Sequence, residues 1–427
     1  MADRRGTATG SGSGSAGTVG TESAVVGGLT AEQRELSQTA ARVLADAAHK
    51  DPLPPEFAAL PLGLNRPLWD TLAELGLLGL AVPESLGGGG AGLLEQCLVA
   101  ERVGAAVAAV PFAPTAAVTA VLSRCAGAEA AEVLGDVVSG AAVVAPAWET
   151  FPAAVVPGRR GSALAVSGST VTGTLGAVPF GMDADRLLAI EPGGAVVLVR
   201  LAGPGVRRDS VPSLDVMEPL ASVVLTAAPC TVAPWSPAEA GGFPVAEILT
   251  VLAAELVGTG QRALDGAVSY ARERRQFGRP IGSFQAIKHM LADRYVQLDA
   301  ARLLVHTAAA DPGSGPATEL ATRTESATRT ESATRTESGA RAESGARAES
   351  AARAESAARA ELAARTALVA ASDAADAATA DALQAHGGIG FTWEHPSHVL
   401  LKRARARRAL LGSAARQLDA MANHILA

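Results

Sequence analysis

The chain has 427 residues, 48% of them hydrophobic, which is enough to bury a large core and to form two or three domains. Its formal net charge is −7 and its isoelectric point is about 5.6, so no basic field favours binding to nucleic acid. The three cysteines, Cys97, Cys125 and Cys230, stand far apart and fit neither a disulfide framework nor CxxC metal spacing. These features favour a protein of the reducing cytoplasm.

Residues 1–28 are rich in Gly, Ser and Thr and contain no apolar segment of the kind that a secretory signal requires. We therefore expect a flexible, disordered tail there. Residues 29–140 then show helical periodicity. Thr30 and Gln33 have the spacing of a capping box at the start of the first helix. Gly76 ends the second helix, ahead of a loop with four consecutive glycines.

The stretch Val103–Ser123 carries no charge and is as long as a membrane span. It consists mostly of Ala, Val, Gly and Thr, and it contains Pro111 and Pro114. Two prolines would interrupt a lone helix in lipid. We therefore predict a buried helix–loop–helix and no membrane span.

Between residues 141 and 240 the pattern changes to short β-branched runs separated by Gly, Pro and Ser. Five such runs in under a hundred residues predict a small β-barrel or sandwich. Helical periodicity returns over residues 241–427. The predicted order of the domains is therefore a helical domain, a β-domain and a helical bundle.

One segment repeats every six residues from Ala321 to Leu362. Six residues advance a helix by about 600°, so successive copies occupy three faces and no apolar stripe forms. The repeat places Glu325 four residues before Arg329, the favourable order for a helical ion pair. We interpret the segment as an insert in the bundle, either a solvated helix with paired charges or a partly helical flexible segment.

Three blocks carry a family resemblance, in this order along the chain: WDTLAELGLLGLAVPESLGG, YARERRQFGRPIGSFQAIKHMLAD and ALQAHGGIGFTWEHPSHVLLKRA. In order, spacing and local character they resemble the acyl-CoA dehydrogenase family. The resemblance runs from Leu29 to the carboxyl terminus and is interrupted only by the repeat. It implies an α+β multidomain fold, with an N-terminal helical domain, a central β-barrel and a C-terminal four-helix bundle, assembled as dimers or tetramers.

The resemblance also implies FAD as the cofactor. The block QFGRPIGSFQAIKH aligns Arg274, Phe277 and Gln285 with residues that contact FAD across a subunit interface. Arginine suits this position because a guanidinium binds a pyrophosphate through two parallel hydrogen bonds.

Gln384, Gly387 and Gly388 match a second FAD contact of the family, and Ser413 matches a position near the flavin. Paired glycines let backbone N–H groups approach a phosphate without an intervening Cβ. His386, His395 and His398 stand close by in sequence, but no thiolate accompanies them, so we expect no metal site.

The family reaction removes a proton from Cα of an acyl-CoA thioester with a glutamate while hydride leaves Cβ for the flavin. The two positions at which the family carries this glutamate are occupied here by Leu411 and Ile248, which cannot accept a proton. Glu247, next to Ile248, is our candidate base. Glu255, two helical turns beyond Ile248, is a second and weaker candidate.

Three functions stay open at this point. In the first, the chain is a complete FAD-dependent acyl-CoA dehydrogenase that uses Glu247 and forms a homodimer or homotetramer. Or it is the non-catalytic half of a heterotetramer with a second acyl-CoA dehydrogenase-like subunit. Or it catalyses a different flavin reaction, an oxidation or oxygenation in a biosynthetic pathway. For the dehydrogenases, the resemblance implies an acyl-CoA substrate and electron-transferring flavoprotein as the electron acceptor.

Overall fold

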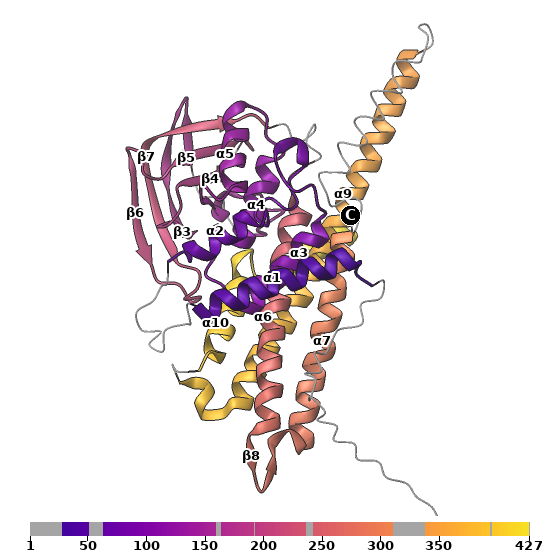
Figure 1. The fold of residues 1–427 in the computed structure, drawn as a ribbon. Helices are drawn as coiled ribbons and strands as arrows, with labels where there is room; N and C mark the ends of the chain where they lie inside the picture. The colour runs from indigo at the N-terminus through magenta and orange to yellow at the C-terminus, as the bar shows by residue number, and fades with distance from the viewer. Residues whose placement is uncertain are drawn as a thin grey trace, which may run out of the picture.

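The computed structural model describes most of the chain, in three parts that Figure 1 shows side by side. The predicted tail, apart from Gly28, and the first part of the predicted repeat fall outside the described residues. The described ranges are 28–50, 63–158, 164–191, 193–235, 242–310, 338–392 and 395–426.

Five helices form the amino-terminal part: α1 (Ala31–Lys50), α2 (Arg66–Glu74), α3 (Leu93–Ala106), α4 (Phe112–Leu122) and α5 (Ala128–Val138). The predicted capping box is present. The backbone N–H of Thr30 donates to Gln33 Oε1 at 2.9 Å, and that of Gln33 donates to Thr30 Oγ1 at 3.2 Å. Gly76 follows α2 with a φ of 70°, a left-handed conformation that glycine adopts without a steric penalty.

The predicted helix–loop–helix is also confirmed. Helix α3 ends at Ala106, Pro111 lies at the amino-terminal cap of α4, and nearly every residue of α4 is buried. In the part of the chain that the structure describes, no helix is long and apolar enough to cross a membrane.

Seven strands form the central sheet: β1 (Val144–Pro146), β2 (Ala165–Ser167), β3 (Thr170–Pro179), β4 (Arg186–Ile190), β5 (Val196–Arg200), β6 (Val206–Val211) and β7 (Leu220–Ala233). Strand β7 is shared between two halves of the sheet. Its first part pairs with β3 and β6, and its end pairs with β5. Ala227, with a φ of 46°, lies in the part that pairs with β3, where the register between the two strands shifts.

The predicted β-domain is therefore confirmed as a mixed sheet, which among the described residues is not closed into a barrel. Its strand order is β1-β4-β5-β7-β3-β2, with β6 paired to β7. Among the described residues, β1 pairs only with β4 and β2 only with β3, so these two short strands leave the ends of the sheet unjoined.

The carboxy-terminal part consists of long helices: α6 (Val245–Glu273), α7 (Gln285–Ala310), α9 (Ser338–His386), α10 (Ser397–Leu410) and α11 (Ala414–Leu426). Helices α6, α7 and α9 pack along one another, and α9 extends beyond the body of the molecule at its amino-terminal end (Figure 1). A small hairpin of β8 (Arg275–Gln276) and β9 (Arg279–Pro280) joins α6 to α7. The described residues also contain four short 3₁₀ helices: Glu84–Leu86, Trp148–Thr150, Ile281–Ser283 and Gly387–Phe391.

A close crossing of α3 and α6 fixes the amino-terminal half of α6. A Cβ at Gly258 would lie 1.9 Å from the carbonyl oxygen of Glu101, and a Cβ at Gly104 would lie 2.1 Å from that of Glu255. The hydroxyl of Thr259 donates across the crossing to the Gly104 carbonyl at 3.3 Å. The two backbones can therefore touch only because both positions are glycine.

Candidate functional site

The first group of predicted cofactor residues lies at the exposed carboxyl end of α6. Arg274 follows the last residue of the helix, Phe277 lies in the β8–β9 turn, and Gln285 is the first residue of α7. All three are exposed, and Phe277 is 91% exposed. Within the described residues, the Arg274 guanidinium makes no hydrogen bond or ion pair.

Phe277 is unusual in two respects. Its φ is 51°, a left-handed conformation that costs a non-glycine residue about 1–3 kcal/mol. Its ring also stands in solvent, with an edge-on contact to Phe284 at 6.2 Å between centroids. An apolar ring held in a strained backbone conformation without burial is typical of a binding contact rather than of a fold-stabilising one.

The second group lies at the carboxyl end of α9. Gln384 and Gly388 are exposed, and Gly387 has a φ of 62° in the turn that ends the helix. A Cβ built on either glycine would meet nothing within 4 Å. The backbone of this turn can therefore be approached closely by a ligand from outside.

A stack of rings joins these two groups. The Tyr270 ring on α6 lies 4.6 Å from the His386 ring at the end of α9, and His386 lies 4.3 Å from His395. Tyr270 is one turn before Arg274, and His386 is next to Gly387. The fold thus brings the QFGRP block and the HGGIG block to the same end of the bundle.

Ser413 lies apart from these residues. It follows α10, whose 14 residues span about 20 Å, at the end of that helix away from His395. Its side chain is exposed, and its hydroxyl accepts the N–H of Arg416 at 3.4 Å at the start of α11. Ser413 therefore lies about one length of α10 away from the His395 end.

The residues at the exposed end fit a dinucleotide cofactor such as FAD. An exposed guanidinium without a protein partner suits a pyrophosphate, an exposed aromatic ring suits a planar heterocycle, and the open glycine turn suits a close backbone contact. Each of these groups faces outward, so a cofactor held by them would bind at the surface of the chain rather than in its interior.

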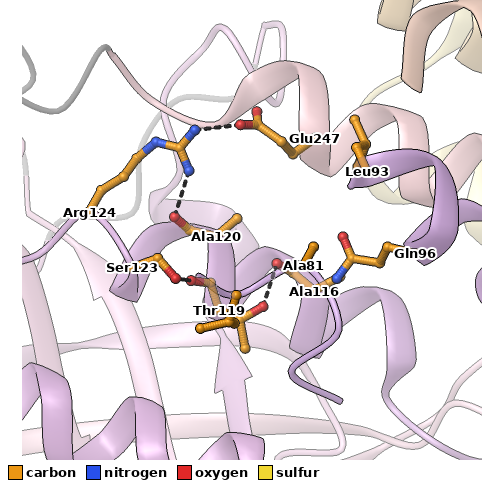
Figure 2. Close-up of a pocket in the computed structure, with 10 residues that line it drawn as sticks. Ala81, Leu93, Gln96, Ala116, Thr119, Ala120, Ser123, Arg124 and Glu247 are labelled. Atoms are coloured by element: carbon orange, nitrogen blue, oxygen red, sulfur yellow. Dashed lines mark hydrogen bonds and ion pairs between the residues drawn. The ribbon is translucent and has the colours of Figure 1, made fainter. Parts of the chain in front are cut away.

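The candidate base lies at the other end of the same helix. Glu247 is in the first turn of α6, and the 29 residues of the helix place it about 40 Å from Arg274. Glu247 and Arg124 form an ion pair in which the two side chains are 10% and 9% exposed (Figure 2). The cavity beside them holds about 20 Å³, which is room for a single water molecule.

Glu255 is even more enclosed, at 1% exposure. One of its oxygens accepts the backbone N–H of Ala113 at 3.2 Å, and the other lies 3.1 Å from Nη2 of Arg407 on α10. Arg407 also forms an ion pair with Glu218, which precedes β7. The sequence placed Glu255 near the site but gave no sign of these two partners.

A second buried pair adjoins the first. Arg403 lies 3.8 Å from Asp215, and both side chains are 1% exposed. Arg403 also donates to the Ala108 carbonyl at 3.1 Å. We call these five side chains the buried charge cluster: Asp215, Glu218, Glu255, Arg403 and Arg407.

The buried charge cluster holds three carboxylates and two guanidinium groups, and its electrostatics follow from that imbalance. Burial raises the pKa of Glu218, against the attraction of Arg407 and with the repulsion of Asp215 and Glu255. Burial by itself would lower the pKa of Arg407, but the surrounding carboxylates more than offset it and raise that pKa. The sequence did not predict the buried charge cluster, because its members are far apart along the chain. Only its two arginines stand close together, in the run RARARR of α10.

The two family base positions lie in this closed region. Leu411 is 2% exposed and Ile248 is 4% exposed, and both belong to the main hydrophobic core. Both side chains are thus packed as core residues. Neither the apolar pair nor the paired carboxylates nearby present a free basic group.

A wider hollow of about 430 Å³ lies along the β-domain next to α5. Its buried wall includes Arg186, whose guanidinium lies 3.7–3.9 Å from Glu129, Glu132 and Asp136 on α5. Acidic and basic groups line it in similar number, and none of the predicted site residues faces it.

Comparison with known proteins decides the family. The acyl-CoA dehydrogenase N-terminal domain matches residues 30–141, and the C-terminal domain matches residues 250–348 and 331–426. The chain belongs to the acyl-CoA dehydrogenase family. The two C-terminal matches meet inside the hexapeptide repeat. The family binds FAD and oxidises the CH–CH bond of acyl-CoA thioesters.

Several mycobacterial proteins are similar to this family member. Acyl-CoA dehydrogenase FadE34 of Mycobacterium tuberculosis is 33% identical over 83% of this chain, which spans 41% of the length of that protein. Acyl-CoA dehydrogenase IpdE2 of the same organism is 30% identical over 90% of this chain and 93% of its own length.

Solved structures share the fold over nearly the whole chain. A variant of the Tcur3481-Tcur3483 steroid ACAD has a TM-score of 0.70 at 28% identity and covers 92% of this chain and 98% of its own. The ChsE4-ChsE5 complex from Mycobacterium tuberculosis has a TM-score of 0.70 at 25% identity, covering 93% and 98%. Butyryl-CoA dehydrogenase from Megasphaera elsdenii, at 21% identity and a TM-score of 0.69 over 94% and 99%, shares the fold.

Proposed function

We propose that this chain is the non-catalytic subunit of a heteromeric acyl-CoA dehydrogenase, and that it completes the FAD site of a second, catalytic subunit. The observation that carries the proposal is the contrast between the two ends of α6. Residues suited to a cofactor are exposed at one end, and the positions suited to a base are apolar or ion-paired and buried at the other.

The closed end supports the proposal because a general base needs a free lone pair that can reach a substrate proton. Glu247 is neutralised by Arg124, and Glu255 by Arg407 and a backbone N–H. The cavity beside Glu247 has room for one water molecule and none for an acyl chain. Under this proposal Glu247 is a structural carboxylate that anchors the first turn of α6.

The open end supports the proposal because the Arg274 guanidinium makes no hydrogen bond or ion pair within the described residues and Phe277 is 91% exposed. Arg274 and Phe277 face outward, about 40 Å from the base positions. A cofactor held there therefore reacts with a substrate that another subunit binds. Arg274, Phe277, Gln285, Gln384, Gly387 and Gly388 would hold the FAD, and Ser413 belongs to a different surface.

The similarity to the Tcur3481-Tcur3483 and ChsE4-ChsE5 proteins supports an assembly of two unlike chains. Bound FAD supplies the hydride acceptor. This chain contributes charge neutralisation of the cofactor phosphates through Arg274 and excludes water from the heterocycle through Phe277. We extend the proposal to an acyl-CoA substrate on the partner and to electron-transferring flavoprotein as the acceptor.

The test compares the chain alone with the chain co-expressed with each second acyl-CoA dehydrogenase-like chain of its own genome. We expect a colourless protein alone, and with one partner a yellow complex that acyl-CoA bleaches anaerobically near 450 nm, a typical flavin band. Arg274→Gln should lower the FAD retained by the complex. Arg272→Gln removes another exposed arginine one half-turn earlier and should leave it unchanged.

Two outcomes would overturn the proposal. One is a yellow chain that acyl-CoA bleaches without any partner. The other is a complex whose bleaching is lost in Glu247→Gln, since that result would return the role of base to this chain. Retention of bleaching in Glu247→Gln is the result we expect.

A further inference from the structure

The ring stack at the end of α9 contains two histidines in contact. Their hydrogen bonds indicate whether Nδ1 of each ring carries a proton. Nδ1 of His386 lies 2.7 Å from the carbonyl oxygen of Ala382, which can only accept, so Nδ1 carries a proton. Nδ1 of His395 accepts the backbone N–H of Ser397 at 3.3 Å, so Nδ1 of His395 carries none. A proton added to His395 at Nδ1 breaks the bond to Ser397.

The surroundings of the stack oppose a charge on it. His386 is 7% exposed, and its ring lies between Tyr270 and His395. Burial lowers the pKa of His395, and the nearby His386 and His398 lower it further. Two imidazolium rings with centroids 4.3 Å apart would repel each other directly.

Among the described residues, the charged groups on the neighbouring elements supply no net negative charge to the stack. On α9 the closest carboxylate in sequence is Asp381, which is paired with Arg294 of α7 at 3.0 Å. On α10, His398 is followed one turn later by Lys402. On α6, Glu273 follows Tyr270 by three residues, but it stands in the exposed run Arg272–Arg275 with three arginines, so this end of α6 carries net positive charge.

We propose that the Tyr270–His386–His395 stack is an acid-sensitive clamp that holds the end of α9 against the end of α6 while its histidines are neutral, and releases it when His395 takes up a proton. The clamp acts on the two segments that carry Arg274 and Gly387. It is independent of which partner or ligand those segments bind.

The direction of the effect follows from proton linkage. Because the folded pKa of His395 is below its unfolded value of about 6.5, the clamp contributes its full stability above that pH. The contribution declines as the pH falls from about 6.5 toward the lowered folded pKa. Each pH unit over which the two states differ in protonation corresponds to about a tenfold change in the opening equilibrium.

The test measures local opening by hydrogen–deuterium exchange of residues 378–390 at the end of α9, corrected for the intrinsic pH dependence of exchange. Between about pH 7.5 and pH 5.5 we expect the wild-type chain to lose protection by more than about twofold and by at most about tenfold, the limit set by the unfolded value of about 6.5. His395→Asn keeps an acceptor for the Ser397 N–H but cannot be protonated, and should lose less than about twofold. His289→Asn, an exposed histidine on α7, should behave as wild type.

A second measurement guards against misfolding of the variant. Titration of the histidine C2 protons by NMR in the wild-type chain should show one histidine with a pKa below about 6.5 whose resonance is absent in His395→Asn. Equal loss of protection in wild type and His395→Asn, or a His395 that titrates at or above the ordinary value, would overturn the clamp. Because both readouts use the isolated chain, they fail or succeed separately from the proposed assembly with a catalytic subunit.

Discussion

Charged side chains are buried and paired at one end of α6 and exposed at the other. At its amino end, Glu247 and Glu255 are buried, and each is paired with an arginine from another element. At its carboxyl end, Arg274 is exposed and makes no ion pair within the described residues. A buried charge must be paired because its desolvation is costly, whereas an exposed charge is solvated by water and stays available to a ligand. The comparison separates the end of the helix that holds the fold together from the end that is available to bind.

The largest effect should come from removing a positive charge of the buried charge cluster. Arg407→Met leaves Glu218 and Glu255 without their guanidinium, and the loss of one partner of a buried pair costs about 3–5 kcal/mol. The neighbouring Arg408→Met is the matched control, because Arg408 is one-third exposed and its pairs with Asp373 and Asp376 are worth about 1 kcal/mol or less. Urea denaturation measures both. Similar losses in the two variants would contradict the assignment of the amino end as structural.

The next largest effect on stability is expected from substituting a glycine at the α3–α6 crossing, compared with a glycine on the exposed part of α6. Gly258→Ala forces a Cβ into the backbone of α3, where the nearest atom is 1.9 Å away, so we expect a loss of at least about 1–3 kcal/mol. Gly266→Ala lies on the exposed part of the same helix with nothing within 4 Å, and should stabilise by about 0.5–1 kcal/mol. Opposite shifts of the thermal midpoint would sharpen the comparison. Destabilisation by both substitutions would mean that the carboxyl half of α6 is packed more tightly than its contacts indicate.

Local signals in the sequence predicted local features of this fold well. The Thr30–Gln33 capping box and the break between α3 and α4 at Pro111 follow from residues a few positions apart, and both are confirmed. The sequence predicted a β-barrel or a sandwich and could not choose between them, because closure depends on whether two strands as short as β1 and β2 meet. That is a question of three-dimensional register which alternation along a strand does not address.

The candidate site divides in the same way. Arg274 and Gly387 belong to contiguous blocks that the sequence shows directly, whereas the fold shows that the two blocks lie at one end of the bundle. The pairs Arg124–Glu247 and Arg407–Glu255 join residues more than a hundred positions apart, so no spacing rule reveals them. The sequence showed Glu247 as an acidic residue near a base position. Only the fold shows that an arginine already neutralises it.

A smaller effect concerns the proton balance at the buried end. The raised pKa of Glu218 means that the folded chain binds a proton more tightly there than the unfolded chain does, whose glutamate titrates near 4.3. The stability this contributes is present below about pH 4.3 and is lost as the pH rises through the raised folded pKa. Glu218→Gln, a neutral mimic of the protonated form, should therefore gain stability relative to wild type as the pH rises through that range. Urea titrations at several pH values measure the difference, and a difference that moves the other way would mean that Arg407 dominates and Glu218 is fully ionised.

The smallest effect on stability should be at Phe277. Asparagine adopts the left-handed conformation of this position more readily than phenylalanine, and the ring buries little surface in the chain. Phe277→Asn should therefore change the unfolding free energy by about 0.5 kcal/mol or less.

The same substitution should reduce the FAD retained by the complex with a catalytic subunit, since it removes the exposed ring. A loss of more than about 1 kcal/mol in the isolated chain would show that Phe277 supports the hairpin rather than a ligand. An unchanged unfolding free energy together with weaker FAD retention is the combination expected of a binding contact. If removing the ring does not destabilise the free chain, then the strained conformation of Phe277 serves the bound cofactor and not the fold.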